Sequence, residues 1–367
     1  MYKTLLFSGA ILLGGLIACA SGGVDNPDNG AAKQKPANPP DTASPDKPRT
    51  DTPPVTTPKD QNDKNRLEAI SKTVAALVAL KIPELYNKYV DLNTLEILDY
   101  DTLLSRLKTI QVIYVAEQHT NEAHHSLQLN ILKSLSQKNP KTALAMEFLY
   151  RSKQEVIDNY SADKITEEEF DKAVLFGFGE WYHYYTPLIR YAHKTKIKVI
   201  GMNVEKETKS KLAEMGWDKL TPDEQKLIAK DIDTSNKAHK EFVMKQFQGM
   251  MNDPRTKKMM QGPMMERMYL MQCIWDETFA EAIANYLKAV NDPAVQVVVV
   301  AGAGHIEYKF NIPERAYKRN PAPYKTLIPV EVNNPGELNL TESLLDSNRG
   351  DFIYFSPHQG EGEPPIK

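Results

Sequence analysis

Four apolar runs in this sequence are each followed at once by residues that can exchange protons or bind cations. Residues 112–116 precede Glu117 and His119, and residues 143–146 precede Glu147. Residues 197–202 precede Asn203, and residues 295–301 precede the GAGH segment that ends at His305. If these runs are neighbouring strands of a parallel sheet, their carboxyl ends meet at one rim, where such sheets bind ligands. The pattern therefore predicts one site in which Glu117, His119, Glu147 and His305 do acid–base chemistry or hold zinc, manganese or iron.

Two further histidines, His124 and His125, lie in a helix that we predict near residues 121–138. The apolar stripe of this helix includes His124, whereas His125 lies near its edge. Because the positive end of a helix disfavours an imidazolium, the ring of His124 should be neutral. It is then either a ligand or base at the predicted site, or a core histidine bonded to the backbone.

The two glutamates are costly to bury unless they are paired or bind a cation. Arg151 could neutralise Glu147 in an ordinary salt bridge. The glycines of GAGH allow a sharp turn that presents His305. The spacing fits no compact zinc motif such as HExxH, so a metal site depends on the fold. Its predicted ligands are Glu117, His119, His124, Glu147 and His305.

A second group of candidates is the ring-rich segment EWYHYYTPLIRYAH at residues 180–193. Rings of this kind commonly line a core or an interface. The alternative is a haem pocket, because Tyr and His ligate haem iron and flat rings stack on a porphyrin. The sequence has no CxxCH, so such a haem would be bound without a covalent link. The candidates for cofactor binding are Tyr182, His183, Tyr184 and Tyr185 of this segment, packed with Trp181, together with His124 and His125.

The order of elements predicts an α/β fold with a mostly parallel sheet flanked by helices on both faces. The four apolar runs above are short and β-branched, and helical patterns separate them. Two more apolar runs follow at 327–332 and 352–355. Helices are expected near residues 66–89, 121–138, 152–160, 166–175, 184–195, 222–232, 236–248 and 263–290.

The segment of about residues 205–262 is longer than a normal crossover, and we interpret it as a helical insertion or lid. Nine of the 13 methionines fall between Met244 and Met271. They either fill gaps in a core or form an adaptable surface for a flat apolar ligand. Cys273 is expected to be buried in a helix.

The N-terminal residues 1–18 have the pattern of a signal peptide, with an apolar stretch too short to span a bilayer. LIAC at residues 16–19 resembles a lipobox, which predicts that Cys19 carries lipid and holds the protein on a membrane without crossing it. The alternative is an ordinary secretory signal with a chance cysteine. Residues 19–66 are rich in proline and poor in large apolar residues, so we expect a disordered tether.

The main domain is then expected at residues 67–356, with a flexible tail at 357–367. The chain has 45 Lys and Arg against 48 Asp and Glu, and no window is dominated by basic residues. It therefore lacks the electrostatic footprint of a nucleic-acid-binding protein.

Together the motifs resemble the ChaN family of haem-binding bacterial lipoproteins, within the wider group of Tiki proteases, TraB/GumN proteins and erythromycin esterases. The matching pieces are AEQHTNEAHHSLQL, ALAMEF, EWYHYYTPLIRYAHKTKIKVIGMN, QCIWD and VVVVAGAGHIEYKFNIPERAYKR, over roughly residues 98–320. Ala116 stands where the family's GExH motif has glycine, and Trp275 stands where the late helix usually has an arginine.

The resemblance implies a bacterial lipoprotein that binds haem or another iron porphyrin in iron uptake or storage. Ala20, directly after Cys19, resembles the outer-membrane rather than the inner-membrane sorting pattern, so we expect lipid anchoring in the cell envelope at the outer membrane. The family resemblance also implies a dimer. The matched polar positions are Glu117, His119, His124, His125, Glu147 and His305, and Tyr182, Tyr184 and Tyr185 are candidates for the haem ligand.

Two other expectations stay open. One is a metal-dependent hydrolase, similar to Tiki peptidases or erythromycin esterases, in which Glu117, His119, Glu147 and His305 activate water. The other is a surface adhesin or scaffold in which this site is vestigial.

Overall fold

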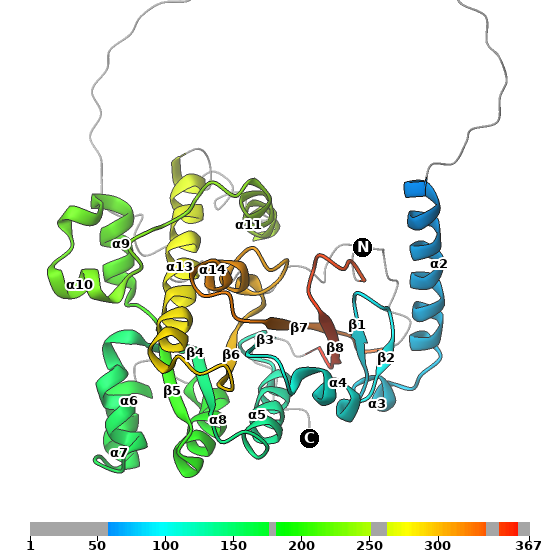
Figure 1. Cartoon of the computed structure of the whole chain (residues 1–367). Helices are drawn as coiled ribbons and strands as arrows, with labels where there is room; N and C mark the ends of the chain where they lie inside the picture. The colour runs from blue at the N-terminus through cyan, green and yellow to red at the C-terminus, as the bar shows by residue number, and fades with distance from the viewer. Residues whose placement is uncertain (1–57, 176–180, 251–262, 335–344, 359–367) are drawn as a thin grey trace, which may run out of the picture.

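The computed structural model describes residues 58–175, 181–250, 263–334 and 345–358. At its centre is one sheet of eight strands in the order β2-β1-β8-β7-β3-β6-β4-β5 (Figure 1). All neighbours from β8 to β5 are parallel, whereas β1 is antiparallel to β2 and to β8. The strands are β1 (Tyr89–Asp91), β2 (Ile97–Leu98), β3 (Val112–Glu117), β4 (Thr142–Tyr150), β5 (Lys198–Asn203), β6 (Gln296–Gly302), β7 (Tyr324–Glu331) and β8 (Phe352–Ser356). The predicted mostly parallel sheet is confirmed.

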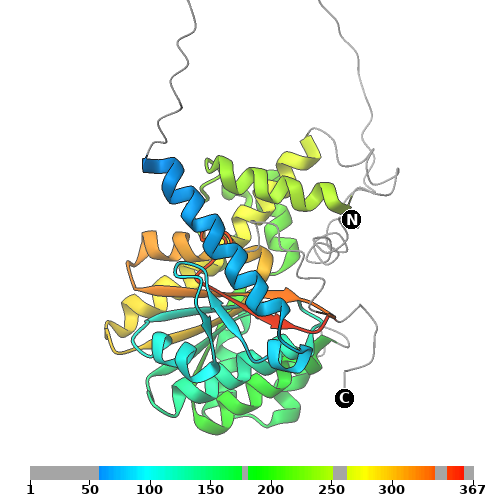
Figure 2. The same ribbon diagram turned by 90° about the vertical axis from the view of Figure 1, so that its right-hand side faces the viewer.

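Helices cover both faces of the sheet, as predicted (Figure 1). One face carries α4 (Tyr100–Leu107), α5 (Glu122–Ser136), α6 (Gln154–Ser161) and α8 (Tyr182–Thr195). The other carries α13 (Pro263–Val290) and α14 (Ile312–Arg319), with α2 (Pro58–Val78) near the β1–β2 end (Figure 2). None of the described helices is long and apolar enough to cross a membrane.

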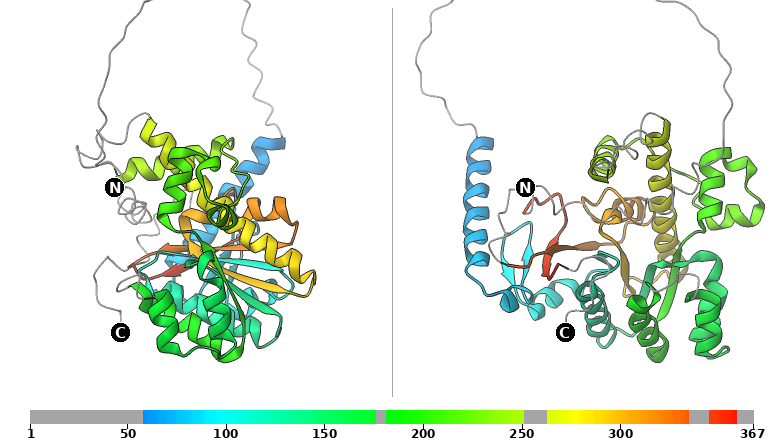
Figure 3. Two further views of the ribbon diagram at one scale, coloured as in Figure 1. Left: turned by 90° about the vertical axis from the view of Figure 1, so that its left-hand side faces the viewer. Right: turned by 180° about the vertical axis from the view of Figure 1, so that it is seen from behind.

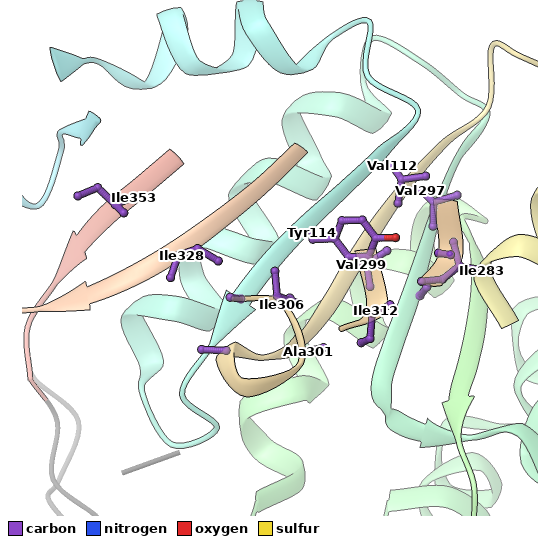
Figure 4. Close-up of a cluster of buried hydrophobic side chains, with 14 of the residues drawn as sticks. Val112, Tyr114, Ile283, Val297, Val299, Ala301, Ile306, Ile312, Ile328 and Ile353 are labelled. Atoms are coloured by element: carbon purple, nitrogen blue, oxygen red, sulfur yellow. The ribbon is translucent and has the colours of Figure 1, made fainter. Parts of the chain in front are cut away.

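The core is split by the sheet into two apolar layers, because successive side chains of a strand point to opposite faces. Tyr114 of β3 and Val299 of β6 lie on the α13 face with Ile283 of that helix (Figure 4). Ile113 and Val298, their neighbours in sequence, lie in the opposite layer. All residues of β3 and β6 are buried, so these two strands hold the rim of the site rigidly.

The N-terminal part of the domain differs from the prediction. The helix expected over 66–89 is wrong at both ends, because α2 starts at Pro58 and ends at Val78. Residues 58–66, expected in the disordered tether, are therefore helical, and the rest of the expected tether, 19–57, lies outside the described residues. A separate turn, α3 (Ile82–Leu85), follows with Pro83 in its first turn. Proline lacks the backbone N–H that a continuing helix needs, so it starts a new helix instead.

Several short elements were not predicted: β1, β2, α4, α14 and the first helix of the insertion, α9 (Lys206–Met215). β1 and β2 have three and two residues, too few to show an alternation. The tail expected to be loose from residue 357 begins in contact with the domain. Asn121 donates to the Pro357 carbonyl, and His358 Nδ1 lies 2.8 Å from Glu331 Oε2.

The described residues between β5 and α13 form α9, α10 (Pro222–Leu227) and α11 (Lys237–Met250) (Figure 3). The helices expected over 222–232 and 236–248 are thus confirmed as α10 and α11. They pack on the first half of α13 through two small apolar clusters. Met268 and Met271 are buried in these clusters and so fill a core, whereas Met244, Met264 and Met265 are partly buried against it. The lid role stays a prediction. The remaining short elements are η1 (Arg151–Lys153), α7 (Glu167–Phe170), η2 (Asp171–Leu175), η4 (Trp217–Lys219) and η5 (Ala303–His305).

Candidate functional site

The carboxyl ends of β3, β6 and β4 lie side by side and bring the predicted acid and imidazole groups together. Glu117 is level with Gly302 in the register of β3 and β6. A Cβ on Gly302 would lie 3.2 Å from His119 Nε2 and 3.6 Å from Glu147 Oε2. A side chain at residue 302 would therefore press against the His119 ring, so glycine is favoured there.

Glu117 and His119 form the first buried pair at this rim. His119 Nδ1 lies 2.8 Å from Glu117 Oε1, Tyr185 donates its hydroxyl to the same oxygen, and Gln128 donates to Oε2 at 2.7 Å. Burial would raise the pKa of Glu117, but the charge of His125 and the bond with His119 outweigh it and lower the pKa to about 2. Since an ionised Glu117 only accepts, His119 donates from Nδ1 and its Nε2 is left facing Gly302.

The pKa of His119 moves in the direction expected for such a pair. Burial disfavours the imidazolium, but the hydrogen bond to Glu117 and the charge of Glu147 raise the pKa above its usual value. The side chain keeps 19% exposure. This partly open ring is the group of the pair that a ligand or substrate can reach.

Glu147, His305 and Asp276 form the second buried group. His305 Nδ1 lies 2.6 Å from Asp276 Oδ1, and its Nε2 lies 3.4 Å from Glu147 Oε1. Burial opposes a charge on the ring, yet the two carboxylates raise the pKa of His305 to about 10. Burial likewise opposes ionisation of Glu147, but His305 and the Gly302 N–H lower its pKa to about 2. His305 is thus an imidazolium between two carboxylates at neutral pH.

The second group continues into the helical insertion. His239 of α11 places Nε2 3.3 Å from Asp276 Oδ2, and Arg315 of α14 donates to His239 Nδ1 at 3.1 Å. Arg315 also pairs with buried Glu277. All four of these side chains are almost fully buried. The network ties α11 of the insertion to α13, α14 and the rim.

Of the histidines on α5, His124 does not share the rim. Its Nδ1 accepts from the Gln118 N–H at 2.8 Å and its Nε2 lies 2.8 Å from Ser356 Oγ. Burial and then the charge of His125 lower the pKa of His124 to about 3, so it is a neutral core histidine. His125 lies 3.4 Å from Glu117 and supports that carboxylate. The ligand role predicted for His124 is corrected accordingly.

The metal site predicted from Glu117, His119, His124, Glu147 and His305 receives no support. Within the described ranges, no three His, Cys, Asp or Glu side chains are grouped so that they could hold a metal ion. The ordinary salt bridge considered for Glu147 is not formed either. Arg151 instead pairs with Glu281 at 3.2 Å.

The ring-rich segment lies at the start of α8, beside the first pair. Trp181 has its ring centroid 6.3 Å from that of His119. Tyr184 stacks on His125 at 5.4 Å. Tyr185 is buried against Phe148 and bonded to Glu117, whereas Tyr182, Tyr184 and Trp181 are partly exposed and His183 is exposed. The segment thus splits into one core tyrosine and a partly open set of rings.

Sequence reasoning gave no role to Gln128, His239, Gln272 or Asp276. Gln272 and Asp276 are four residues apart on α13 and both reach His305. Their i, i+4 spacing on an apolar helix was a usable signal, because polar groups on a buried stripe need partners. His239 could not be found this way, because only the docking of α11 brings it to Asp276.

The fold and the rim define an α/β protein with buried imidazole–carboxylate pairs beside an open ring cluster. The family model described as haem-binding uptake, Tiki superfamily, ChaN matches residues 103–316, so the chain belongs to this family. The comparison with curated proteins finds no match.

Among solved structures, the chain is similar to one described as cofacial heme binding to ChaN of Campylobacter jejuni. That match has 16% identity and a TM-score of 0.53, and covers 72% of this chain and 95% of the other. The match to the type III effector HopBA1 has 14% identity and a TM-score of 0.40, and covers 71% of this chain and 93% of the other. The match to a mutant of the erythromycin esterase EreC in its open conformation has 12% identity and a TM-score of 0.37, and covers 66% of this chain and 76% of the other. At these identities the first match supports the shared fold.

Proposed function

We propose that this chain binds haem or another iron porphyrin non-covalently at the ring cluster of α8, in haem uptake or storage. The observation that carries the proposal is the partly open set of rings Trp181, Tyr182, His183 and Tyr184 beside His119, in a chain of a haem-binding family. Flat rings offer stacking surface for a porphyrin, and Tyr or His can ligate its iron.

The contacts narrow the choice of iron ligand. Tyr185 is the weakest candidate, because it is buried and its hydroxyl donates to Glu117. Burial, followed by the charge of Glu117, raises the pKa of its hydroxyl well above the usual value, which disfavours a ligating phenolate. Tyr182, His183 and Tyr184 are more accessible and remain the candidates. His124 and His125 are weaker candidates as well, because both are buried: His124 bonds to Gln118 and Ser356, and His125 lies against Glu117.

Titration of the purified chain with haemin, followed at the Soret band, tests the proposal. Wild type should bind at micromolar concentration or below, and the triple variant Tyr182→Phe/His183→Gln/Tyr184→Phe should lose the ligation spectrum. Tyr191→Phe is the matched control, because Tyr191 lies in the same helix but bonds to Ser136. No Soret shift with wild type, or an unchanged spectrum in the triple variant, would remove the proposal.

The proposal includes attachment to the cell envelope through lipid on Cys19, at the outer membrane. The lipobox-like LIAC and the proline-rich stretch that follows it support this placement. A homodimer that encloses the ligand, implied by the family resemblance, is part of the same proposal.

A second candidate function is hydrolysis by acid–base chemistry, and the geometry of Glu117 and His119 favours it. A carboxylate that fixes Nδ1 and leaves Nε2 open is the arrangement of a general base. Glu147, held ionised by His305, would position water or substrate. Hydrolysis of ester or peptide substrates that wild type performs and His119→Gln does not would support this function; equal rates in both proteins would remove it.

A further inference from the structure

Lys209 of α9 is a buried amine at the carboxyl end of β5. The residue is only 3% exposed. Its Nζ donates to Asn203 Oδ1 at 3.0 Å and lies 4.2 Å from the centroid of the Trp275 ring. No carboxylate of the described residues lies within ion-pair distance of Nζ. An ammonium has three N–H donors, so its hydrogen-bonding capacity is incompletely used by these contacts.

The position is costly for an unpaired cation. Burial lowers the pKa of Lys209 to about 7, and the charges of Glu147, Glu205 and Glu207 offset only part of this effect. The face of Trp275 stabilises the cation further. An anion that enters the site would complete the pairing of Lys209.

Lys209 is also contiguous with the acid–base groups of the rim. The Trp275 ring meets the His305 ring almost perpendicularly, with centroids 6.2 Å apart, and His305 contacts Glu147. Asn203 Oδ1 accepts from Trp275 Nε1 at 3.2 Å as well as from Lys209. One amide therefore positions both the cation and the ring that covers it.

We infer that Lys209, held by Asn203 and Trp275, is a subsite for a carboxylate of the bound ligand, which for haem is a propionate. The inference rests on the proposed haem binding and adds the part of the ligand that this lysine recognises. A charge-assisted N–H···O bond strengthens when it is shielded from water.

The test compares haemin with haemin dimethyl ester, whose propionates are neutral, by Soret titration of the full chain in the same detergent. Wild type should bind haemin roughly tenfold or more tightly than the dimethyl ester, a difference in affinity of the size that one charge-assisted hydrogen bond contributes. Lys209→Met should weaken haemin and leave the ester unchanged, which abolishes the preference. Lys206→Met, a partly exposed lysine of the same helix, should behave as wild type.

A purely structural Lys209 would weaken both ligands equally, so an unchanged preference in Lys209→Met overturns the inference. If that variant does not fold, the same comparison of the two ligands with Asn203→Asp provides a second test. The new carboxylate would pair with Nζ and must reduce the preference for haemin; a preference equal to that of wild type overturns the inference. Wild type that binds both ligands equally removes only the propionate subsite. Wild type that binds neither ligand removes the proposed haem binding and the subsite together.

Discussion

His305 is held between Glu147 and Asp276, and Glu117 is held between His119 and His125. In each case a buried charge is tolerated because an opposite charge lies within hydrogen-bond or ion-pair reach. Removing one partner leaves the other charge buried without an opposite charge, which destabilises the folded state. The residue-scale predictions follow from this dependence.

The first prediction concerns His305→Gln. The folded pKa of His305 is raised to about 10, above its ordinary value, so its contribution to stability is full below pH 6.5 and is lost as pH rises through about 10. The variant should lose about 3–5 kcal/mol of unfolding free energy at about pH 6 and much less at about pH 10. Urea unfolding at both pH values measures the difference. A deficit that does not change with pH would contradict the account.

The second prediction concerns Glu117→Gln. The glutamine can keep hydrogen bonds to Tyr185 and His119 but carries no charge, so the pKa of His119 should fall from its raised value. Imidazole NMR titration of His119 follows this shift. Glu122→Gln, in the first turn of α5, is the control and should leave the titration where it is. A His119 pKa that is equal in all three proteins would show that Glu117 does not set it.

At the scale of elements, the rim depends on how β6 passes between its neighbours. β6 pairs with β3 on one side and β4 on the other. Its last residue, Gly302, donates its N–H to Glu147 of β4, and a Cβ there would meet the ring of His119, which follows β3. The turn that follows, η5, presents His305 to α13. A small change at the end of β6 therefore reaches both acid–base groups at once.

The third prediction compares Gly302→Ala with Gly304→Ala. A Cβ at residue 302 would lie 3.2 Å from His119 Nε2, whereas one at residue 304 would meet only the Gln246 side chain at 3.5 Å. Gly302→Ala should cost about 1–3 kcal/mol by overpacking and shift the NMR signals of His119. Gly304→Ala should change neither. Thermal unfolding and NMR spectra measure both effects, and two variants with the same behaviour would refute the close approach.

The α/β class and the convergence of Glu117, Glu147 and His305 could be predicted because buried parallel strands leave long apolar runs that end in polar residues. The failures have physical causes as well. His124 lies on the buried stripe as predicted, but Ser356 of β8 and the Gln118 N–H satisfy its ring. Periodicity fixes the face of a helix and says nothing about partners that arrive from distant strands.

Lys209 shows the same limit. Because Lys209 lies on a polar helix of the insertion, the local sequence predicts that it is exposed to solvent. Only the packing of α9 against α13 brings it to Trp275. Its burial follows from tertiary packing and could not be read from local sequence. The insertion therefore contributes two groups to the neighbourhood of the rim, His239 and Lys209, that pattern analysis missed.

At the scale of the whole molecule, the ring cluster and the acid–base groups of the described domain lie together at the carboxyl ends of the parallel strands. We propose that the residues before this domain link it to a membrane through Cys19. The fourth prediction is that Cys19→Ser moves the protein from the membrane fraction to the soluble fraction and leaves haemin affinity unchanged. Fractionation and Soret titration test both parts. A variant that stays with the membrane would contradict lipid attachment at this residue.

The central claim is that haem binds where the rings of α8 meet the His119 side of the rim. Its most direct measurement is a crystal structure of the chain with haemin, with anomalous data collected at the iron absorption edge. The account predicts an iron peak within coordination distance of Tyr182, His183 or Tyr184, with the porphyrin against Trp181. An iron peak at the β1–β2 end of the sheet, or ordered crystals that contain haem-free protein at saturating haemin, would contradict it.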